Sequence, residues 1–404
     1  MSSTGPATPS VPAAHGGPTL GSTPVLICSA SLGAGVGVVF PLLAEFQDRY
    51  GFSDAGLGML SAATFLAALV SGLFLAGLGD RGHVRTLLVV GMALSAVGML
   101  WFAISSELWQ FSGARLLEGL GYGLYLPAAR KIVTAGDPGS AGMRLGRLTS
   151  AEFGGFLAGP VVGSLLSEMF GLSAPLVVMG VIQVGLALWM VAVALPPVPT
   201  SRARRSPLAS FRMLRRPSVF GAAMLSLALF LPIGVYDALW SRYLTDRGAS
   251  TLFIGIGLSL YAVPIVLFAP TGGRIADRFG PVRAASIAIC VVIPLTLSYG
   301  LLAAPLLITA AGLMQSIPEA VGSPAVQTVM LRACRPDEVA SGQGVAHAVN
   351  QVGAGSAALL GPIVYGAYGS EVLFAGLALA MAVLFSIGVA LHRRGGGEAR
   401  VELT

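Results

Sequence analysis

The sequence predicts an all-α integral membrane protein whose twelve transmembrane helices form two six-helix bundles. Of its 404 residues, 55% are hydrophobic and only 10% are charged, whereas about 25% of the residues in soluble globular proteins are charged. The apolar residues gather in runs of about 20, the length that an α-helix needs to cross a bilayer. Almost all basic residues fall in the short loops between these runs, as expected of a membrane protein with a fixed orientation.

The apolar runs divide the chain into its predicted parts. The first six runs cover residues 24–46, 56–78, 86–105, 109–135, 148–170 and 173–196, and the second six cover 218–243, 252–273, 284–304, 306–331, 342–369 and 371–391. We therefore expect an N-terminal bundle over 24–196 and a C-terminal bundle over 218–391, joined by a cytoplasmic linker over 197–217 that carries six arginines and no acid. Residues 1–23 lack the basic start of a signal peptide and are predicted to form a disordered cytoplasmic tail, and residues 392–404 form a second cytoplasmic tail.

The basic residues also predict the orientation of the chain in its membrane. With the N-terminus inside, 20 of the 24 lysines and arginines lie in cytoplasmic loops or tails, and three lie outside. Positive residues favour the cytoplasmic side, so we expect both termini there. The remaining basic residue, Arg115, lies within an apolar run.

Composition and motifs exclude several classes of function. The net charge of +6 does not indicate a nucleic-acid partner, because the basic residues sit in the loops between membrane helices. Three scattered cysteines, and no second His or Cys at ligand spacing, predict no disulfide, metal site or cofactor. The sequence lacks GxxxxGK[ST], HExxH and GxSxG motifs, so we expect neither a nucleotide-driven pump nor an intramembrane enzyme.

Segments of the first half recur at equivalent places in the second. GLGDRGHVR (77–85) and RIADRFGPVR (274–283) each follow a second helix, and AGPVVG (158–163) and LGPIVYG (360–366) each lie in a fifth helix. Two such repeats are typical of secondary transporters, whose substrate site lies between the repeats.

The loop after the eighth predicted helix carries a family resemblance. GGRIADRFGPVR resembles the signature between helices 2 and 3 of the major facilitator superfamily and its repeat between helices 8 and 9, with matches at Gly273, Asp277, Arg278 and Gly280. The first-half copy, which contains Asp80, Arg81 and Arg85, is one residue shorter and lacks the later glycine. The resemblance implies the major facilitator fold and transport of a small molecule by alternating access.

The aspartates of these two loops are predicted to latch the halves together. Asp80 and Asp277 follow the C-terminal end of a helix, where the helix dipole disfavours a carboxylate. The free N–H groups at the start of a helix from the other half would stabilise them, near Gly342 for Asp80 and near Leu148 for Asp277. The alternative is a tight turn whose arginines bind anionic lipid headgroups.

A run of small residues in the fifth helix resembles a motif associated with exporters in the superfamily. GGFLAGPVVGS (154–164) matches that motif at Gly155, Gly159, Pro160 and Gly163, and Gly361 and Pro362 recur in the second half. Small residues four apart let helix backbones approach closely. The alternative is generic helix packing without a bearing on transport direction.

The fourth helix carries charges in its apolar run, in GARLLEGLGYG (113–123). Arg115, Glu118, Tyr122 and Tyr125 are spaced 3, 4 and 3, so they share one helix face. A charge at the bilayer centre costs about 2.5–3.5 kcal/mol, so this face should line the bundle interior or a wet cavity. The phrase resembles the superfamily's helix 4 motif, which implies a role for Arg115 and Glu118 in proton coupling. A static ion pair is the alternative.

Further polar residues are candidates for the substrate cavity. Asp237 and Trp240 lie in the seventh helix, Glu319 lies between two prolines in the tenth, and His347 and Asn350 form a polar strip in the eleventh. Tyr122 and Tyr125 complete the predicted cavity. An interfacial aromatic belt is the alternative for the residues near Asp237, and hydrogen-bonded packing is the alternative for His347.

Together these features predict a proton-coupled transporter that exports a small neutral or cationic amphiphile. Its partners are the substrate, protons and the lipid bilayer, and we expect a monomer in the cytoplasmic membrane of a bacterium. The alternative function is an uptake symporter or facilitator on the same fold.

Overall fold

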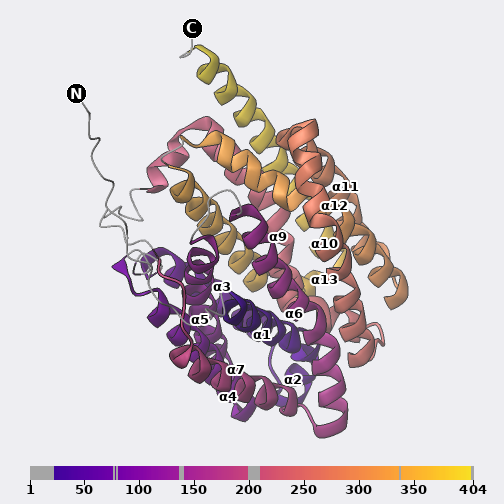
Figure 1. Cartoon of the computed structure of the whole chain (residues 1–404). Coiled ribbons are helices and arrows are strands. Elements are labelled where there is room, and N and C mark those ends of the chain that lie inside the picture. Colours follow the sequence, from indigo (N-terminus) through magenta and orange to yellow (C-terminus); the bar gives the residue numbers. More distant parts are fainter. Residues whose placement is uncertain are drawn as a thin grey trace, which may run out of the picture.

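The computed structural model describes residues 22–75, 78, 81–135, 141–198, 210–335 and 338–401, and the regular structure of these residues is helical (Figure 1). The first crossing consists of α1 (Thr23–Val39), the short 3-10 turn η1 (Phe40–Leu42) and α2 (Leu43–Tyr50). The long helices that follow are α3 (Asp54–Phe74), α4 (Val84–Ile104), α5 (Leu108–Thr134), α6 (Ala141–Phe170), α7 (Ala174–Ala192), α9 (Pro217–Thr245), α10 (Thr251–Phe279), α11 (Pro281–Leu301), α12 (Pro305–Ala333) and α13 (Val339–Val401). Gly369, with a φ of 81°, divides α13 into two legs. The described residues thus contain the twelve predicted crossings.

Two of the crossings are less apolar than the others. Nine segments of the described chain are long and apolar enough to span a membrane, and one of them, Ser341–Arg394, covers both legs of α13. The two helices outside this set are α5 and α12, which carry Arg115 and Glu118, and Gln315 and Glu319, respectively. Charged residues within a membrane helix almost always face the protein interior or a wet cavity. The charged residues of α5 and α12 are therefore expected to face the protein interior or a wet cavity.

The helix bounds differ from the predicted apolar runs where polar residues extend a helix beyond the hydrocarbon region. The helix α6 begins at Ala141 rather than near residue 148, and α10 ends at Phe279 rather than at 273. Hydropathy measures only the part of a helix that lies in hydrocarbon, so it misses such extensions. The predicted disordered tail up to residue 21 and residues 199–209 of the predicted linker lie outside the described residues, whereas the end of the linker forms η4 (Phe211–Arg215) and residues 392–401 continue α13.

The second helix of each half begins in the same way. Ser53 before α3 and Ser250 before α10 each accept a hydrogen bond at 3.2 Å from the backbone N–H three residues later. Such a serine satisfies one of the free N–H groups at a helix start. The preceding turns contain Gly51 and Gly248, with φ of 69° and 82°, a conformation that glycine adopts readily. The repeat that the sequence predicts therefore extends to local helix chemistry.

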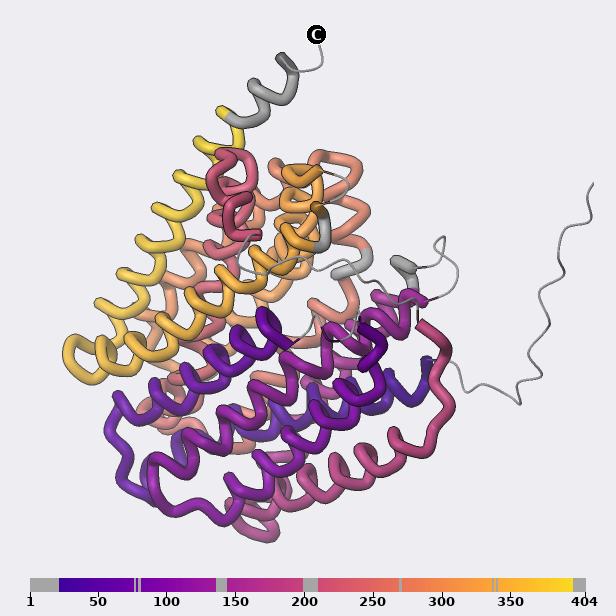
Figure 2. Tube along the Cα trace, turned by 90° about the vertical axis from the view of Figure 1, so that its left-hand side faces the viewer, coloured from indigo at the N-terminus to yellow at the C-terminus, as the bar shows by residue number. Residues whose placement is uncertain are grey.

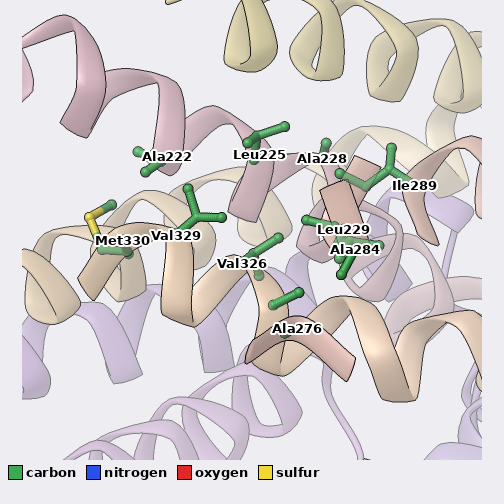
Figure 3. Packing of buried hydrophobic residues seen from close by; sticks show 14 of the residues in the cluster. Ala222, Leu225, Ala228, Leu229, Ala276, Ala284, Ile289, Val326, Val329 and Met330 are labelled. Carbon is green, nitrogen blue, oxygen red and sulfur yellow. The ribbon is translucent and has the colours of Figure 1, made fainter. Parts of the chain in front are cut away.

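Each half has its own apolar core. Figure 2 shows the two halves as two groups of helices, with the indigo-to-magenta N-terminal half below the pink-to-yellow C-terminal half. The N-terminal half buries clusters around Met92 and Phe111. In the C-terminal half, Leu225 and Leu229 of α9 pack with side chains of α11 and α12, among them Ile289 and Val326 (Figure 3). A smaller cluster that includes Phe65, Ala238 and Ala354 lies between the halves.

The halves contact one another most closely at the end of the bundle away from the chain termini. We call this end the distal face; it carries the turns at Gly51, Ser105, Gly171, Gly248, Leu302 and Gly369. Near it, a Cβ added to Gly58 of α3 would lie 2.7 Å from the carbonyl oxygen of Leu359 of α13. Towards the other end, which we call the terminal face, a Cβ added to Gly72 would find only His347, at 3.9 Å. The helices α3 and α13 therefore diverge from the distal face towards the terminal face.

Candidate functional site

A buried arginine of α5 binds carboxylates from both halves. Arg115 and Glu118 lie one turn apart, and Arg115 Nη1 donates a hydrogen bond to Glu118 Oε2 at 2.9 Å. The Nη2 atom of Arg115 donates to both carboxylate oxygens of Asp237 on α9, at 3.3 and 3.2 Å. The intrahelical pair that the sequence predicts is thus present, and Asp237 makes it part of a three-residue ion cluster that bridges the two halves.

The ion cluster is enclosed and carries an unequal number of charges. Arg115 is 1% exposed, and Glu118 and Asp237 are each 5% exposed. It combines one guanidinium with two carboxyl groups, and Arg115 Nε and Glu118 Oε1 have no hydrogen-bond partner among the described residues. Isolating a charge at such a site costs several kcal/mol. The cluster can therefore accept one proton and still leave Arg115 paired with a carboxylate.

Two more contacts between the halves lie between the ion cluster and the distal face, at successive positions of α9. Ser241 Oγ donates to the carbonyl oxygen of Pro41 at 2.7 Å and accepts from the N–H of Ala44 at 3.3 Å. One residue further along, Arg242 forms an ion pair with Asp48 of α2. The Arg242–Asp48 pair borders a pocket of about 750 Å³ that is lined by residues of both halves. These contacts close the distal side of the ion cluster.

A second polar cluster lies within the C-terminal half, between α9, α10, α11 and α12. Glu319 accepts hydrogen bonds from Gln315 Nε2, at 2.8 Å, and from the hydroxyl of Tyr261. Gln315 also donates to the hydroxyl of Tyr236 at 3.0 Å and accepts from the hydroxyl of Tyr299 at 2.8 Å. Glu319 and Gln315 are therefore held by tyrosines from three different helices.

Trp240 packs against the same tyrosines. Its ring centroid lies 5.3 Å from that of Tyr236 and 5.1 Å from that of Tyr299, both with steep angles between the ring planes. We refer to Tyr236, Trp240, Tyr261 and Tyr299 as the aromatic cluster. Trp240 and Glu319, which the sequence predicts for one cavity, are thus brought to one site.

Other predicted cavity residues lie elsewhere. Tyr125 is 1% exposed, and its hydroxyl donates to the carbonyl oxygen of Val25 at 2.8 Å, so its assignment to a substrate cavity is wrong for this conformation. Tyr125 lies towards one edge of the predicted α5 face, and its side chain enters the core between α1 and α4. Tyr122 is partly buried against the same core. Asn350 donates to Ser226 Oγ at 2.9 Å and so connects α13 to α9 within one half, whereas His347 is exposed near the terminal face.

Asp277, the predicted latch aspartate that the structure describes, does not bind the other half in this conformation. Asp277 is 72% exposed and lies 3.7 Å from Arg332 of its own half, rather than at the start of α6. The expected contact is missing because the halves diverge towards the terminal face, where Asp277 lies. Asp80 lies outside the described residues.

The basic residues and glycines of these loops have local roles. Arg85 donates to the carbonyl oxygens of Val191, at 3.0 Å, and Val193, and thereby pairs with free carbonyls at the end of α7. Arg81 is exposed, and Arg278 lies over the adjacent ring of Phe279. Gly280 ends α10 with a φ of 91°, whereas Gly273 lies within α10 in open surroundings.

The small residues of α6 bring two backbones together. Gly155 faces the carbonyl oxygen of Ala30, and Gly159 faces that of Ala34; a Cβ added to Gly163 would lie 2.9 Å from the carbonyl oxygen of Val38. The predicted close approach is therefore present, with α1 as its partner. Pro160 lies in the same stretch of α6, where its carbonyl accepts from Ser164 Oγ at 2.8 Å. In α13, Gly361 faces Val235 of α9, next to Pro362.

Residues 25–245 and 233–401 match the profile of the Major Facilitator Superfamily. The chain belongs to the major facilitator superfamily. It is therefore a multi-pass membrane transporter of small molecules, built on the two-half fold described above.

Relatives and solved structures of the superfamily match nearly the whole chain. The multidrug resistance protein MdtG of Rahnella sp. (strain Y9602) is 26% identical over 376 residues, which cover 88% of this chain and 89% of that protein. A mutant of the nucleoside transporter NupG has a TM-score of 0.78 at 16% identity and covers 92% of this chain and 99% of its own. A bacterial homologue of the human lysosomal transporter Spinster, in an inward-facing and unoccupied conformation, has a TM-score of 0.75 at 16% identity, over 93% of this chain and 96% of its own.

Sequence reasoning missed three features of the site. The ion pair between Arg115 and Asp237 joins residues 122 positions apart, so no local pattern encodes it. The structure adds Tyr261 and Gln315 as partners of Glu319. The spacing of Gln315 and Glu319, one helical turn apart, was a usable signal for their contact.

Proposed function

We propose that this chain is a proton-coupled secondary transporter that exports a small neutral or cationic amphiphile by alternating access. Similarity to the multidrug resistance protein MdtG supports export, and the absence of a nucleotide-binding loop from the sequence supports a gradient as the energy source. The distribution of basic residues supports cytoplasmic termini in a bacterial cell membrane. One chain contains both halves, so a monomer suffices for transport.

The observation that carries the proposal is the ion cluster between the halves. Alternating access requires the halves to separate at the distal face, and this separation moves Arg115 of α5 away from Asp237 of α9. Glu118 stays with Arg115, because the two lie on the same turn of one helix. A buried carboxylate that loses its cation favours the protonated form. Opening at the distal face is therefore linked to proton uptake by Asp237, and closure is linked to proton release.

The direction of proton movement follows from the orientation of the chain. With cytoplasmic termini, the distal face is external, and the described conformation is closed outside. Asp237 then takes up a proton when the site opens to the outside and loses it when Arg115 returns and the site faces the cytoplasm. One proton moves inward in each cycle while the substrate moves outward. Asp80 and Asp277 would latch the terminal face in the outward-open state.

Transport into inverted membrane vesicles tests this function. With an acidic interior, vesicles that contain the protein should accumulate a fluorescent amphiphile such as ethidium, and Asp237→Asn or Arg115→Ala should bind it but fail to concentrate it. Glu168→Gln removes an exposed carboxylate at the end of α6 and is the matched control, which should accumulate ethidium normally. Because ethidium is only a probe, a neutral dye is measured in parallel. Accumulation that persists in both Asp237→Asn and Arg115→Ala would contradict coupling through the ion cluster, and flux of both dyes in the opposite direction would support the uptake alternative.

A further inference from the structure

The side chain of Glu319 points away from the lipid, yet it is partly exposed. The lipid-facing residues of α12 near it are Leu313, Met314 and Ile317, which are 37%, 61% and 49% exposed. At 100° per residue, Glu319 lies on the opposite side of the helix from these three. Its exposed surface therefore faces the protein interior. Ser323, one turn further along, lies on the same side and is also exposed.

The aromatic residues of α9 show the same combination. None of the large hydrophobic residues that are exposed in the described chain belongs to α9, so this helix is shielded from lipid. Tyr236 and Trp240 of α9 are nevertheless partly exposed, as is Tyr261 of α10. The partly exposed surfaces of these aromatic residues and of Glu319 therefore border one accessible region within the C-terminal half.

Glu319 has hydrogen-bond donors but no cation. Its partners, Gln315 and Tyr261, are neutral, and no arginine, lysine or histidine forms an ion pair with it in the part of the chain that the structure describes. Asp237 differs in this respect, because it forms an ion pair with Arg115. The carboxyl group of Glu319 is thus free to balance a positive charge brought by a ligand.

The surroundings of Glu319 suit a bulky cation. Aromatic faces attract organic cations, and tryptophan does so best. Gly312 of α12 packs against the same rings: an added Cβ would meet Tyr299 Oη at 3.6 Å, Trp240 at 3.9 Å and Tyr261 at 4.0 Å, which are ordinary contact distances. An apolar or aromatic substituent can lie against the partly exposed rings of Tyr236, Trp240 and Tyr261 while a positive centre approaches Glu319.

We propose that Glu319 and the aromatic cluster form a substrate-recognition site that selects a monovalent organic cation with apolar or aromatic substituents. The site deepens the proposed function and rests on it for its role in transport. Binding itself requires no gradient, so it is measured independently of proton coupling.

Two ions of nearly equal shape and opposite charge test the proposal. Tetraphenylphosphonium and tetraphenylborate are titrated into the purified full-length protein in lipid nanodiscs, with binding to empty nanodiscs subtracted. Tetraphenylphosphonium should bind saturably and tetraphenylborate should not. Glu319→Gln should raise the Kd for tetraphenylphosphonium at least about tenfold, which corresponds to roughly 1.4 kcal/mol. Equal binding of the two ions, or an unchanged Kd in Glu319→Gln, would overturn the proposal.

A matched control distinguishes a specific site from a generally negative interior. Glu152 is a partly exposed acid of α6, in the other half of the protein. Glu152→Gln should leave the Kd for tetraphenylphosphonium unchanged, and an equal loss of affinity in both glutamine variants would refute the assignment to Glu319.

Substitutions at Trp240 and Gly312 test the proposal independently if Glu319→Gln does not fold. Trp240→Leu removes a ring face, and Gly312→Leu places a bulky side chain against the rings, because even a Cβ at this position already contacts Tyr299, Trp240 and Tyr261. We expect weaker binding in both leucine variants. Unchanged binding in both folded leucine variants would contradict a site at the rings.

The outcomes separate the cation site from proton coupling. If tetraphenylphosphonium binding depends on Glu319 but no dye is concentrated by a proton gradient, the recognition site stands and the proposed coupling fails. If a neutral dye is concentrated but tetraphenylphosphonium does not bind, the coupling stands and the cation site fails.

Discussion

Replacing Asp237 by asparagine tests whether the ion cluster holds the distal face closed. Asp237→Asn removes a charge from the contact between the halves but keeps a carbonyl oxygen that can accept one hydrogen bond from Arg115. A hydrogen bond to a charged group contributes about 1.5–3 kcal/mol, and the distances of 3.2 and 3.3 Å in this pair favour the lower part of that range. With one weaker bond retained, the closed distal face should lose about 1–2 kcal/mol, a shift of roughly five- to thirtyfold in the conformational equilibrium.

Distance measurements between spin labels detect this shift. Ser106, in the turn between α4 and α5, and Ala303, in the turn between α11 and α12, are exposed on the distal face of opposite halves. Labels at these positions, in a background without Cys290 and Cys334, should show a larger population of long distances in Asp237→Asn. Glu118→Gln is the matched control, because it leaves the pair between the halves intact. Identical distance distributions in Asp237→Asn and the parent protein would falsify the role of Asp237 in closure.

Two further substitutions test the packing of α6 against α1 and the Arg242–Asp48 ion pair near the distal face. Gly155→Val should sharply lower the yield of folded protein, because its Cβ would collide with the carbonyl oxygen of Ala30. Gly154→Val is the control and should fold normally, since nothing lies within 4 Å of an added Cβ there. Equal yields of the two variants on size-exclusion chromatography would contradict the described packing. Asp48→Asn should destabilise the closed distal face by less than about 1 kcal/mol and only at low salt, because the pair with Arg242 is partly exposed to solvent. The same spin labels measure this effect. A large effect that persists in high salt would show that the pair is not screened.

Most of the fold could be predicted because hydrophobic runs and loop charges are local properties of the sequence. The pair Arg115–Glu118 was predictable for the same reason, since residues three apart on a helix are neighbours. The contact of Gly155 with another helix was also predictable from the spacing of small residues, but its partner, α1, was not. Nothing in either segment specifies which neighbour fills the small-residue surface.

The remaining features depend on how the halves are arranged. Asp237 reaches Arg115 only after two bundles have assembled, so a sequence pattern within α9 could suggest a polar position but not its partner. Asp277 was expected at the start of a helix in the other half, and this expectation depends on a conformation in which the terminal face is closed. The helical periodicity that predicts a cavity position for Tyr125 gives the direction of a face only to within a broad angle, and it does not distinguish a cavity from a core.

The position of Glu118 on the same turn as Arg115 has a consequence for biosynthesis. The chain is made from its N-terminus, so α5 enters the membrane before α9 has been synthesised. An arginine near the centre of a membrane helix costs about 2.5–3.5 kcal/mol on insertion scales, and Asp237 cannot offset that cost until the second half exists. Glu118 is available at once, because its contact with Arg115 forms as soon as the turn of α5 does. The intrahelical pair therefore keeps Arg115 paired while the first half is in the membrane and the second half has not yet been inserted.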